Sequence, residues 1–541
     1  MKSILSTLLL FLVVGTSSLF AQWSADLITT PEKTNYTETS TYNDVMNFIK
    51  AVQDKTELVH LEFMGTSLEG KGIPVVVMAN PKITTPEQAK ASGKPVMYIQ
   101  GNIHSGEVEG KEALQILMRE ILFGDKKDLL DNQIILFAPI YNSDSNDKME
   151  QGRRPSQEDS PVKVGIRANS QGWDLNRDGI KMEALETNGL VQNVINKWDP
   201  EIFVDLHTTN GTWHGYSLTW APSYQYAGEP GPYNFTWDKM LPEITKTVKE
   251  KYDLYFGPYG GYSLRQGWPP KAIYTYNHHP RYMVNQMGLR NKIGILSESF
   301  AHERLYQRID ATHAFVTEIL NFTNKNGKEI ARINDKAEQD AIANVKNNAG
   351  KVKKGVRFKM VPLEETFTLR TYNYTAYTDE NNETKYLRSG RIIDVPDVQN
   401  YSKFEATVES TLPRGYLIPA ELSYIAEHLE KQGAIVQKLT KNVKAEGEVF
   451  KVTALNKSKR EFEGHYMATV DGEFKSATKS FKKGDYWIDL AQPLANLIFY
   501  TLEPQSDDGL VTWNFFDEYL EAKGIDKKSV DYPVFKYFNL K

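Results

Sequence analysis

The stretch YIQGNIHSGEVEGKEAL, residues 98–114, places His104 and Glu107 three residues apart, between an apolar run and a segment with helical spacing. A catalytic zinc ion commonly takes two histidines and one glutamate and leaves a fourth position to water. A tight turn from a loop into a helix can aim both side chains at one point. The pair alone is weak evidence, because two polar residues at an ordinary turn give the same pattern.

Two other residues with side chains capable of catalysis or metal binding also stand at the ends of apolar runs. VDLHTTNG places His207 at the end of an apolar run, and GILSESF places Glu298 at the end of another. An unpaired carboxylate is costly to bury there unless it has a function. Between them, RANSQGWDLNRD gathers two arginines and an asparagine in a polar segment: Arg167, Asn176 and Arg177.

Apolar runs alternate with amphipathic helical patterns in this part of the chain. Residues 42–52 and 114–122 have helical spacing, and short β-rich runs occupy residues 72–80, 95–101, 132–142, 200–211 and 292–300. This order predicts an α/β fold, with a mostly parallel mixed sheet and helices on both faces. Ligands bind beyond the carboxyl ends of such strands, where the two histidines and two glutamates are expected.

These segments, in this order, resemble the zinc metallocarboxypeptidase family, the carboxypeptidase A relatives, over roughly residues 40–325. The turn in GTSLEGKGIPVV, residues 65–76, is also similar to the family. The resemblance implies a zinc carboxypeptidase-like fold and one zinc ion per chain, bound by His104, Glu107 and His207. It implies a peptide substrate with a free C-terminal carboxylate, held by Asn176 and Arg177. It further implies a general base that activates the zinc-bound water, Glu298, and an arginine that steadies the oxyanion, Arg167.

Some assignments stay open within the resemblance. Arg153, Arg154 or Arg265 could replace Arg167 at the oxyanion. The sequence departs from the family pattern at NSDS, residues 142–145, and at Asp178, both at the rim of the expected cleft.

Two pairs of aromatic residues near the end of this region are also ambiguous. The family's mobile substrate-capping tyrosine corresponds to Tyr276 by its spacing before Glu298, or to Tyr282 by the sequence around it. His278 and His279 are adjacent. A pair that is solvated, or that contacts metal ligands without binding the metal, is favoured over a second metal site.

The composition limits the classes of protein to which the chain could belong. The chain has 541 residues, 40% of them hydrophobic, which predicts two or three domains. Its net charge of -5 and pI of about 6.1, with both signs interspersed, argue against a nucleic-acid surface or a polybasic membrane patch. The absence of cysteine excludes disulfides, thiolate metal sites and a lipid-anchored cysteine.

The first residues, MKSILSTLLLFLVVGTSSLFAQ, have the pattern of a signal peptide over residues 1–21. The apolar run is shorter than a bilayer span needs, so we expect no stable membrane insertion. The chain is therefore predicted to be a bacterial exported protein, periplasmic or secreted.

The remaining organisation is read from changes in composition. Residues 22–330 are predicted to be the catalytic domain, and the lysine- and asparagine-rich residues 331–355 a linker region. Residues 356–541 are predicted to be an accessory α+β or β-rich domain, with a helix over residues 419–433 that ends at Gly433.

The leading functional hypothesis is an exported zinc-dependent carboxypeptidase that removes one residue from the C-terminus of a peptide. An alternative keeps the zinc but acts as an amidase or peptidase on cell-wall stem peptides, or as a deacylase. The aromatic-rich loops of residues 213–282 leave room for such substrates. A second alternative, a non-catalytic peptide-binding protein of the same fold, is less favoured because all three ligand positions and the base position are filled.

Overall fold

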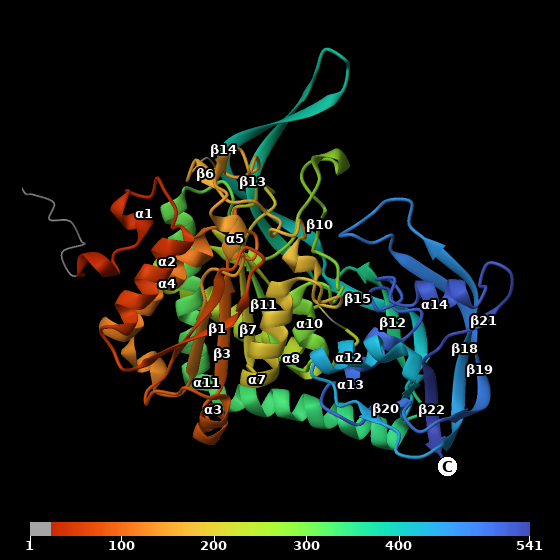
Figure 1. The fold of residues 1–541 in the computed structure, drawn as a ribbon. Coiled ribbons are helices and arrows are strands. Elements are labelled where there is room, and N and C mark those ends of the chain that lie inside the picture. Colours follow the sequence, from red (N-terminus) through yellow and green to blue (C-terminus); the bar gives the residue numbers. More distant parts are fainter. Residues whose placement is uncertain (1–22, 159, 225) are drawn as a thin grey trace, which may run out of the picture.

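The computed structural model describes residues 23–158, 160–224 and 226–541. An eight-stranded mixed sheet forms the centre of the first three hundred residues (Figure 1). Its strands, in order across the sheet, are β1 (Val59–Thr66), β2 (Gly72–Met78), β4 (Ile134–Ala138), β3 (Val96–Gly101), β7 (Ile202–Thr208), β11 (Ile293–Ser299), β8 (Leu218–Pro222) and β9 (Phe256–Pro258).

The middle of this sheet is parallel. β4, β3, β7 and β11 pair in parallel in that order, whereas β1, β2 and β8 join through antiparallel pairings. β3 and β7 are buried along their whole length, as expected for strands covered on both faces. The parallel centre brings the carboxyl ends of β3, β7 and β11 to one edge.

Helices cover both faces, and the strands alternate between the two apolar cores. Met97 and Ile99 of β3 belong to the core formed with α2 (Tyr42–Gln53), α4 (Glu109–Phe123), α9 (Leu241–Tyr252) and α11 (Leu305–Asn348). Tyr98, between them, belongs to the core formed with α6 (Leu185–Leu190) and α10 (Met283–Leu289). This period of two places successive side chains on opposite faces. The predicted fold class is confirmed.

The C-terminal part contains a second, antiparallel sheet. Its strands are β17 (Gln437–Lys438), β20 (Tyr486–Asp489), β16 (Gly415–Ile418), β22 (Phe535–Leu540), β18 (Val443–Lys457) and β19 (Ala468–Phe481), with β21 (Val530–Asp531) beside β18. Its helices are α12 (Ser423–Lys431), α13 (Ala495–Leu502) and α14 (Asp517–Ala522). The region is α+β and rich in strands, as predicted.

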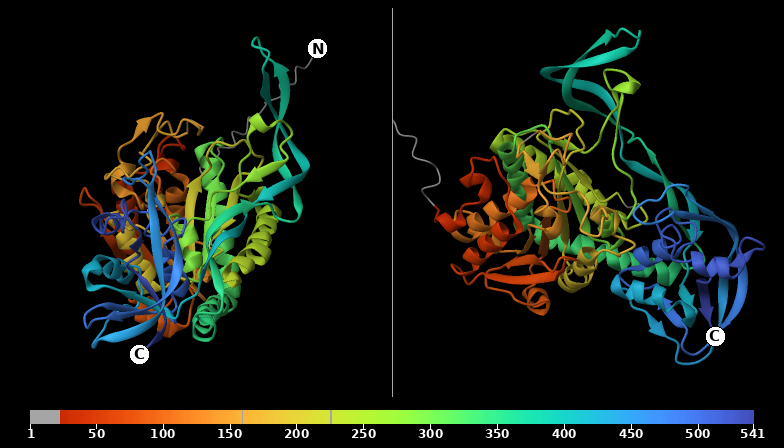
Figure 2. Two further views of the ribbon diagram at one scale, coloured as in Figure 1. Left: turned by 90° about the vertical axis from the view of Figure 1, so that its right-hand side faces the viewer. Right: turned by 45° about the horizontal axis from the view of Figure 1, so that its top comes forward.

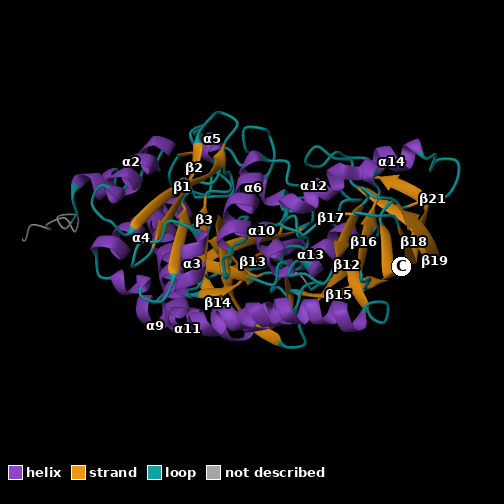
Figure 3. Ribbon diagram, turned by 60° about the horizontal axis from the view of Figure 1, so that its bottom comes forward, coloured by secondary structure: helices purple, strands orange, loops and turns teal. Residues whose placement is uncertain are grey.

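The predicted linker at residues 331–355 is helical as far as Asn348. It is the second half of α11, a 44-residue helix that runs beneath the molecule to the C-terminal sheet (Figure 3). The reason is a narrow buried stripe within a polar composition: Ile330, Asn334, Ala337, Ala341 and Val345 are all buried and recur every three or four residues. The lysines and asparagines lie around this stripe. The division of the chain into domains remains a prediction.

A long hairpin projects from the rest of the molecule, at the top of both views in Figure 2. It consists of β13 (Thr366–Thr378) and β14 (Thr384–Tyr401). At its base, β14 pairs in parallel with β10 (Ala272–Tyr274). β12 (Lys353–Val361) and β15 (Lys403–Thr411) form a separate pair. Strands from the predicted accessory region therefore contact the catalytic region directly.

Among the described residues, no helix has both the length and the apolar character needed to cross a membrane. The predicted signal peptide, residues 1–21, lies outside the described residues.

Candidate active site

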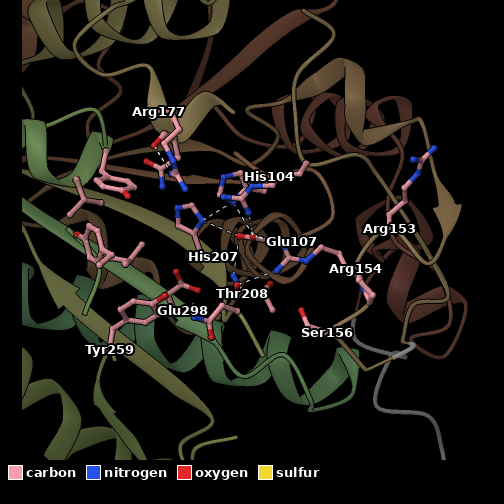
Figure 4. Close-up of a pocket in the computed structure, with 18 residues that line it drawn as sticks. His104, Glu107, Arg153, Arg154, Ser156, Arg177, His207, Thr208, Tyr259 and Glu298 are labelled. Carbon is pink, nitrogen blue, oxygen red and sulfur yellow. Dashed lines mark hydrogen bonds and ion pairs between the residues drawn. The ribbon is translucent and has the colours of Figure 1, made fainter. Parts of the chain in front are cut away.

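All nine residues predicted to form the site line a single pocket of about 390 Å³ at the carboxyl ends of β3, β7 and β11 (Figure 4). They are His104, Glu107, Arg167, Asn176, Arg177, His207, Tyr276, Tyr282 and Glu298. Residues separated by almost two hundred positions in the sequence are thus brought together by the parallel pairing of three strands.

Two glycines shape the loop that carries His104 and Glu107. β3 ends at Gly101, and a Cβ there would lie 2.9 Å from the backbone of Gly110 and of Lys111. The start of α4 therefore packs against the end of β3 with no room for a side chain. Asn102, at φ +67°, turns the chain between them and donates to the Ser105 carbonyl oxygen at 3.2 Å.

Three electron-pair donors converge in this pocket. His104 Nδ1 lies 2.9 Å from Glu107 Oε1, His207 Nδ1 lies 2.9 Å from Glu107 Oε2, and the two Nδ1 atoms are 3.3 Å apart. Each of the three residues is at most 3% exposed. Two imidazoles and one carboxylate are the donor set of a catalytic zinc site.

The outer nitrogen of each imidazole faces a second carboxylate. His104 Nε2 is hydrogen-bonded to Asp174 Oδ1 at 3.0 Å, and His207 Nε2 lies 3.0 Å from Asp205 Oδ2. Such partners hold metal-binding histidines in orientation. Burial opposes a charge on His207, but Asp205 and Glu107 outweigh it and raise its pKa well above the usual value. The donor atoms of His104, Glu107 and His207 lie within 4.8 Å of one another, so one divalent cation could bind all three.

Asp174 connects the histidine cluster to the polar segment of residues 167–178. Its Oδ2 accepts from Arg167 Nε at 3.0 Å, and its Oδ1 accepts from the Asn176 backbone N–H at 2.9 Å. Burial raises the pKa of Asp174, but the positive charges of His104, Arg177 and Arg167 outweigh it and hold the pKa well below the usual range. The Asp174 carboxylate is therefore ionised and fixes three neighbours at once.

Arg177 and Asn176 present donors to the pocket. The Arg177 guanidinium lies 4.7 Å from the centre of the Tyr282 ring, and its Nη1 donates to the Asn176 carbonyl oxygen at 2.9 Å. The Asn176 side-chain oxygen accepts from Met283 N at 3.2 Å, which leaves its amide N–H groups for a ligand. An arginine beside an amide forms a site with the geometry to bind a carboxylate.

Glu298 lies on β11 directly opposite His207 on β7. Burial is the main effect on its carboxyl group; together with repulsion from Glu107, and against attraction from His207, it raises the pKa to about 8. Its Oε2 has no hydrogen-bond partner among the described residues. Glu298 is therefore a partly exposed acid-base group that faces the pocket without forming part of the histidine cluster.

A family model described as zinc carboxypeptidase matches residues 45–432, which is more than half of the chain. The chain belongs to the zinc carboxypeptidase family. Zinc is the cofactor of this family, and His104, Glu107 and His207 are the candidate ligands.

Similar proteins carry related names. This zinc carboxypeptidase is 22% identical over 468 residues to Carboxypeptidase 2 of Trichophyton tonsurans, covering 83% of this chain and 78% of that protein. It is 21% identical over 472 residues to Carboxypeptidase 2 of Trichophyton rubrum, covering 84% and 80%. A solved metallo-carboxypeptidase of Burkholderia cenocepacia matches with a TM-score of 0.40 and 16% identity, over 54% of this chain and 71% of that one.

The three arginines that could replace Arg167 at the oxyanion differ in their contacts. Arg154 donates to Glu107 Oε1 at 2.6 Å and to the Thr208 carbonyl oxygen at 3.3 Å, and Arg153 forms an ion pair with Glu150. Arg265 is not among the described residues that line the pocket. The roles of all site residues in this zinc carboxypeptidase remain predictions.

The aromatic pairs also differ from each other in the structure. The Tyr276 hydroxyl donates to Asn285 Oδ1 at 3.2 Å, whereas Tyr282 packs on Arg177. His278 is 1% exposed and hydrogen-bonded to Asp507 Oδ2 at 3.1 Å. The C-terminal region thus covers His278, whereas His279 is partly exposed, and His278, His279 and Asp507 offer donor atoms within 4.8 Å of one another. The preference for a solvated or metal-supporting pair over a second metal site stays a prediction.

Two pocket features were missed from the sequence. Tyr259 lies beside Glu298 (Figure 4); its only signal was its position in a glycine- and proline-rich stretch after a strand. The second is the contact of Arg154 with Glu107, which depends on Gly106, because a Cβ there would lie 2.7 Å from Arg154 Cγ. A glycine between His104 and Glu107 was the available signal.

Proposed function

We propose that this zinc carboxypeptidase hydrolyses the C-terminal peptide bond of peptides. The observation that carries the proposal is the presence of Arg177 and Asn176 in the same pocket as the His104–Glu107–His207 cluster. A cation site alone would serve many hydrolases. A carboxylate-binding pair beside it favours a substrate whose chain ends there.

His104, Glu107 and His207 would hold the zinc ion, with Asp174 and Asp205 orienting the two imidazoles. Bound zinc supplies Lewis acidity, which makes water a better nucleophile and polarises a carbonyl group. Arg177 would bind the terminal carboxylate through two parallel hydrogen bonds, which a lysine could not form. This contact places the last peptide bond of the substrate next to the cluster.

Glu298 would act as the general base and then as the general acid. Its carboxylate takes a proton from the attacking water and delivers a proton to the leaving amine. Its position opposite His207 on the neighbouring strand, close to the cluster but outside it, suits both transfers. Arg167, whose Nη1 lies 3.5 Å from Glu107 Oε1, is placed to stabilise negative charge on the carbonyl oxygen.

Part of the pocket lining is apolar or aromatic: Val284, Leu296, Tyr259, Tyr276 and Tyr282. This composition favours an apolar or aromatic C-terminal residue. The sequence pattern of residues 1–21 supports export of the chain.

The proposal is tested with an N-blocked peptide that ends in phenylalanine and with the same peptide as its C-terminal amide. We expect kcat/KM to be at least about 100-fold lower for the amide, because a charge-assisted contact with Arg177 contributes roughly 1.5–3 kcal/mol and correct placement adds to it. Arg177→Ala should narrow the difference by lowering the value for the free acid. Equal cleavage of acid and amide by the wild type would contradict the proposal.

A further inference from the structure

A loop of the C-terminal region contacts the segment that carries Asn176 and Arg177, two residues of the catalytic pocket. Residues 458–467 connect β18 to β19, and Glu463 Oε2 in this loop accepts a hydrogen bond from the Asp174 backbone N–H at 2.8 Å. The contact joins residues 289 positions apart. Asp174 is the residue whose carboxylate contacts His104 and Arg167.

The backbone of this loop is in an unfavourable conformation at Glu463. Phe462 and His465 exchange backbone hydrogen bonds of 2.8 and 3.0 Å across two residues, Glu463 and Gly464, whose φ angles are +52° and +81°. Two left-handed residues are typical of a type I′ turn, where asparagine and glycine are preferred. A glutamate in the left-handed region costs about 1–2 kcal/mol. The turn alone does not require this residue.

The two residues that flank the turn are fixed to the catalytic region. His465 Nε2 lies 3.0 Å from the carboxylate of Glu183, and the Phe462 ring lies 5.4 Å from the Arg281 guanidinium. Arg281 is buried and forms an ion pair with Asp508 of the C-terminal region at 2.7 Å. The position of Glu463 is therefore set on both sides before any substrate binds.

The charges around Glu463 do not explain its presence as an ion-pair partner. Within the described part of the chain, no lysine or arginine forms a salt bridge with it, and the carboxylate next to it is Asp174. Burial and then the Asp174 charge raise the pKa of Glu463, and only the hydrogen bond from the Asp174 backbone, with weaker attraction from Lys181 and Arg177, opposes this. The contact with the Asp174 N–H is thus the main interaction that stabilises the charged side chain here.

Asp174 begins the short turn that carries the proposed carboxylate-binding pair. Its backbone oxygen accepts from Arg177 N at 2.9 Å, and its side chain accepts from Asn176 N at 2.9 Å. The remaining backbone group of Asp174, its N–H, is the one that Glu463 holds. A displacement of Asp174 would therefore move Asn176 and Arg177 together.

We propose that Glu463 is a positioning residue for substrate binding: by holding the Asp174 backbone, it sets the place of Asn176 and Arg177. The C-terminal region then takes part in recognising the carboxylate of the substrate. This inference rests on the proposed function, since it assigns Asn176 and Arg177 to that carboxylate.

The test compares Glu463→Gly with Glu463→Gln in the full-length, zinc-loaded enzyme. Glycine removes the acceptor and relieves the left-handed backbone, so the variant should fold with an unchanged or higher Tm. Glutamine keeps an oxygen acceptor. Glu461→Ala, two residues away on the exposed side of the same loop, is the matched control. For each, KM and kcat are measured with the free-acid peptide and its amide, together with zinc content and Tm.

We expect Glu463→Gly to raise KM for the free acid about tenfold and KM for the amide less than twofold, with zinc content unchanged. Glu463→Gln and Glu461→Ala should stay within twofold of the wild type. An unchanged KM for the free acid in Glu463→Gly would overturn the inference, as would an equal loss for acid and amide or an equal loss in Glu463→Gln. If the wild type itself does not prefer the acid, the proposed function fails instead, and the two failures are distinguishable.

Discussion

At the scale of single residues, Glu298 and the histidine cluster have separable duties. Glu298→Gln should lower kcat by about 10²–10⁴-fold, the usual contribution of a general base. Zinc content should not change, because Glu298 is not part of the cluster. Glu303→Gln is the matched control: Glu303 is also a partly exposed glutamate whose pKa is raised, to about 7, but it does not line the pocket. Loss of zinc together with activity in Glu298→Gln would contradict this division.

The affinity for zinc should rise with pH. Asp205 and Glu107 outweigh burial and raise the pKa of His207, so a proton on this imidazole competes with zinc. A folded-state pKa above the unfolded one stabilises the zinc-free protein at low pH, and this stabilisation is lost as pH rises through the folded value. Below that folded value, log K for zinc should therefore increase by about one per pH unit.

Zinc titrations by calorimetry at several pH values, with proton release measured in buffers of different ionisation enthalpy, would check this. Asp205→Asn should lower the pKa of His207 and shift the rise to lower pH. A zinc affinity independent of pH in the wild type would contradict the placement of His207 in the cluster.

The site residues were predictable because their types are rare in apolar strands. His207 and Glu298 each stand near the end of a buried strand, where sequence pattern and chemistry point to the same conclusion. Arg154 was less accessible to sequence reasoning. Its contact with Glu107 depends on the space above Gly106, and that space is set by the folded loop.

At the scale of elements, the junction of β3 and α4 is a close backbone contact that positions Glu107. Gly101→Ala would place a Cβ 2.9 Å from the backbone of Gly110 and Lys111, so α4 must shift and displace Glu107. We expect a loss of about 1–3 kcal/mol in the free energy of unfolding and weaker zinc binding.

Denaturant unfolding and zinc titration of the same variant measure both effects. Gly231→Ala is the control, because its Cβ would meet only Ile333 Cγ2 at 3.7 Å; it should be neutral or slightly stabilising. Equal behaviour of the two variants would show that the close approach at Gly101 does not determine the position of Glu107.

Two helices and five strands of the catalytic region followed from local periodicity. β8 and α9 did not, because they lie in residues 213–282, which were expected to form loops, and neither did the second half of α11. The second half of α11 has few large apolar residues, and alanines and an asparagine form much of its buried stripe. Its burial depends on both regions of the folded chain: Ile330 joins the core of the catalytic region, whereas Ala341 and Val345 join the core of the C-terminal region, from which α13 contacts α11. The composition of residues 331–355 therefore resembled a linker although most of the segment packs as a helix.

At the scale of the whole molecule, the catalytic and C-terminal regions should unfold together. Ile180 and Leu289 of the catalytic region belong to the same apolar core as the C-terminal helices, and Arg290 donates to the Gln432 backbone oxygen at 2.8 Å in a buried contact. We expect one calorimetric transition, with equal calorimetric and van't Hoff enthalpies. Two transitions, only one of which moves when zinc is added, would contradict this.

Breaking the ion pair between Arg281 and Asp508 also tests whether the catalytic and C-terminal regions unfold together. Both groups are buried, so Asp508→Ala leaves an uncompensated charge and should cost about 3–5 kcal/mol. The whole transition should move to lower temperature. A shift confined to part of the heat-capacity peak would indicate that the two regions unfold separately.

The contact between the two regions was the part of the molecule that sequence reasoning missed. Nothing local marks Glu463 or Asp508 as neighbours of the pocket segments, because the interaction requires a chain closure of more than two hundred residues. The role of the accessory domain was left open from composition, whereas the structure shows Glu463 hydrogen-bonded to the Asp174 backbone and Asp508 paired with Arg281.

The most direct test is the zinc content of purified protein, measured by elemental analysis of the wild type and of His104→Ala, Glu107→Ala and His207→Ala. We expect one zinc per chain in the wild type, removed by a chelator and restored on adding zinc, and at least a tenfold weaker zinc affinity in each variant. A wild type without zinc, or three variants that bind zinc as tightly as the wild type, would contradict the assignment of these residues as the metal site.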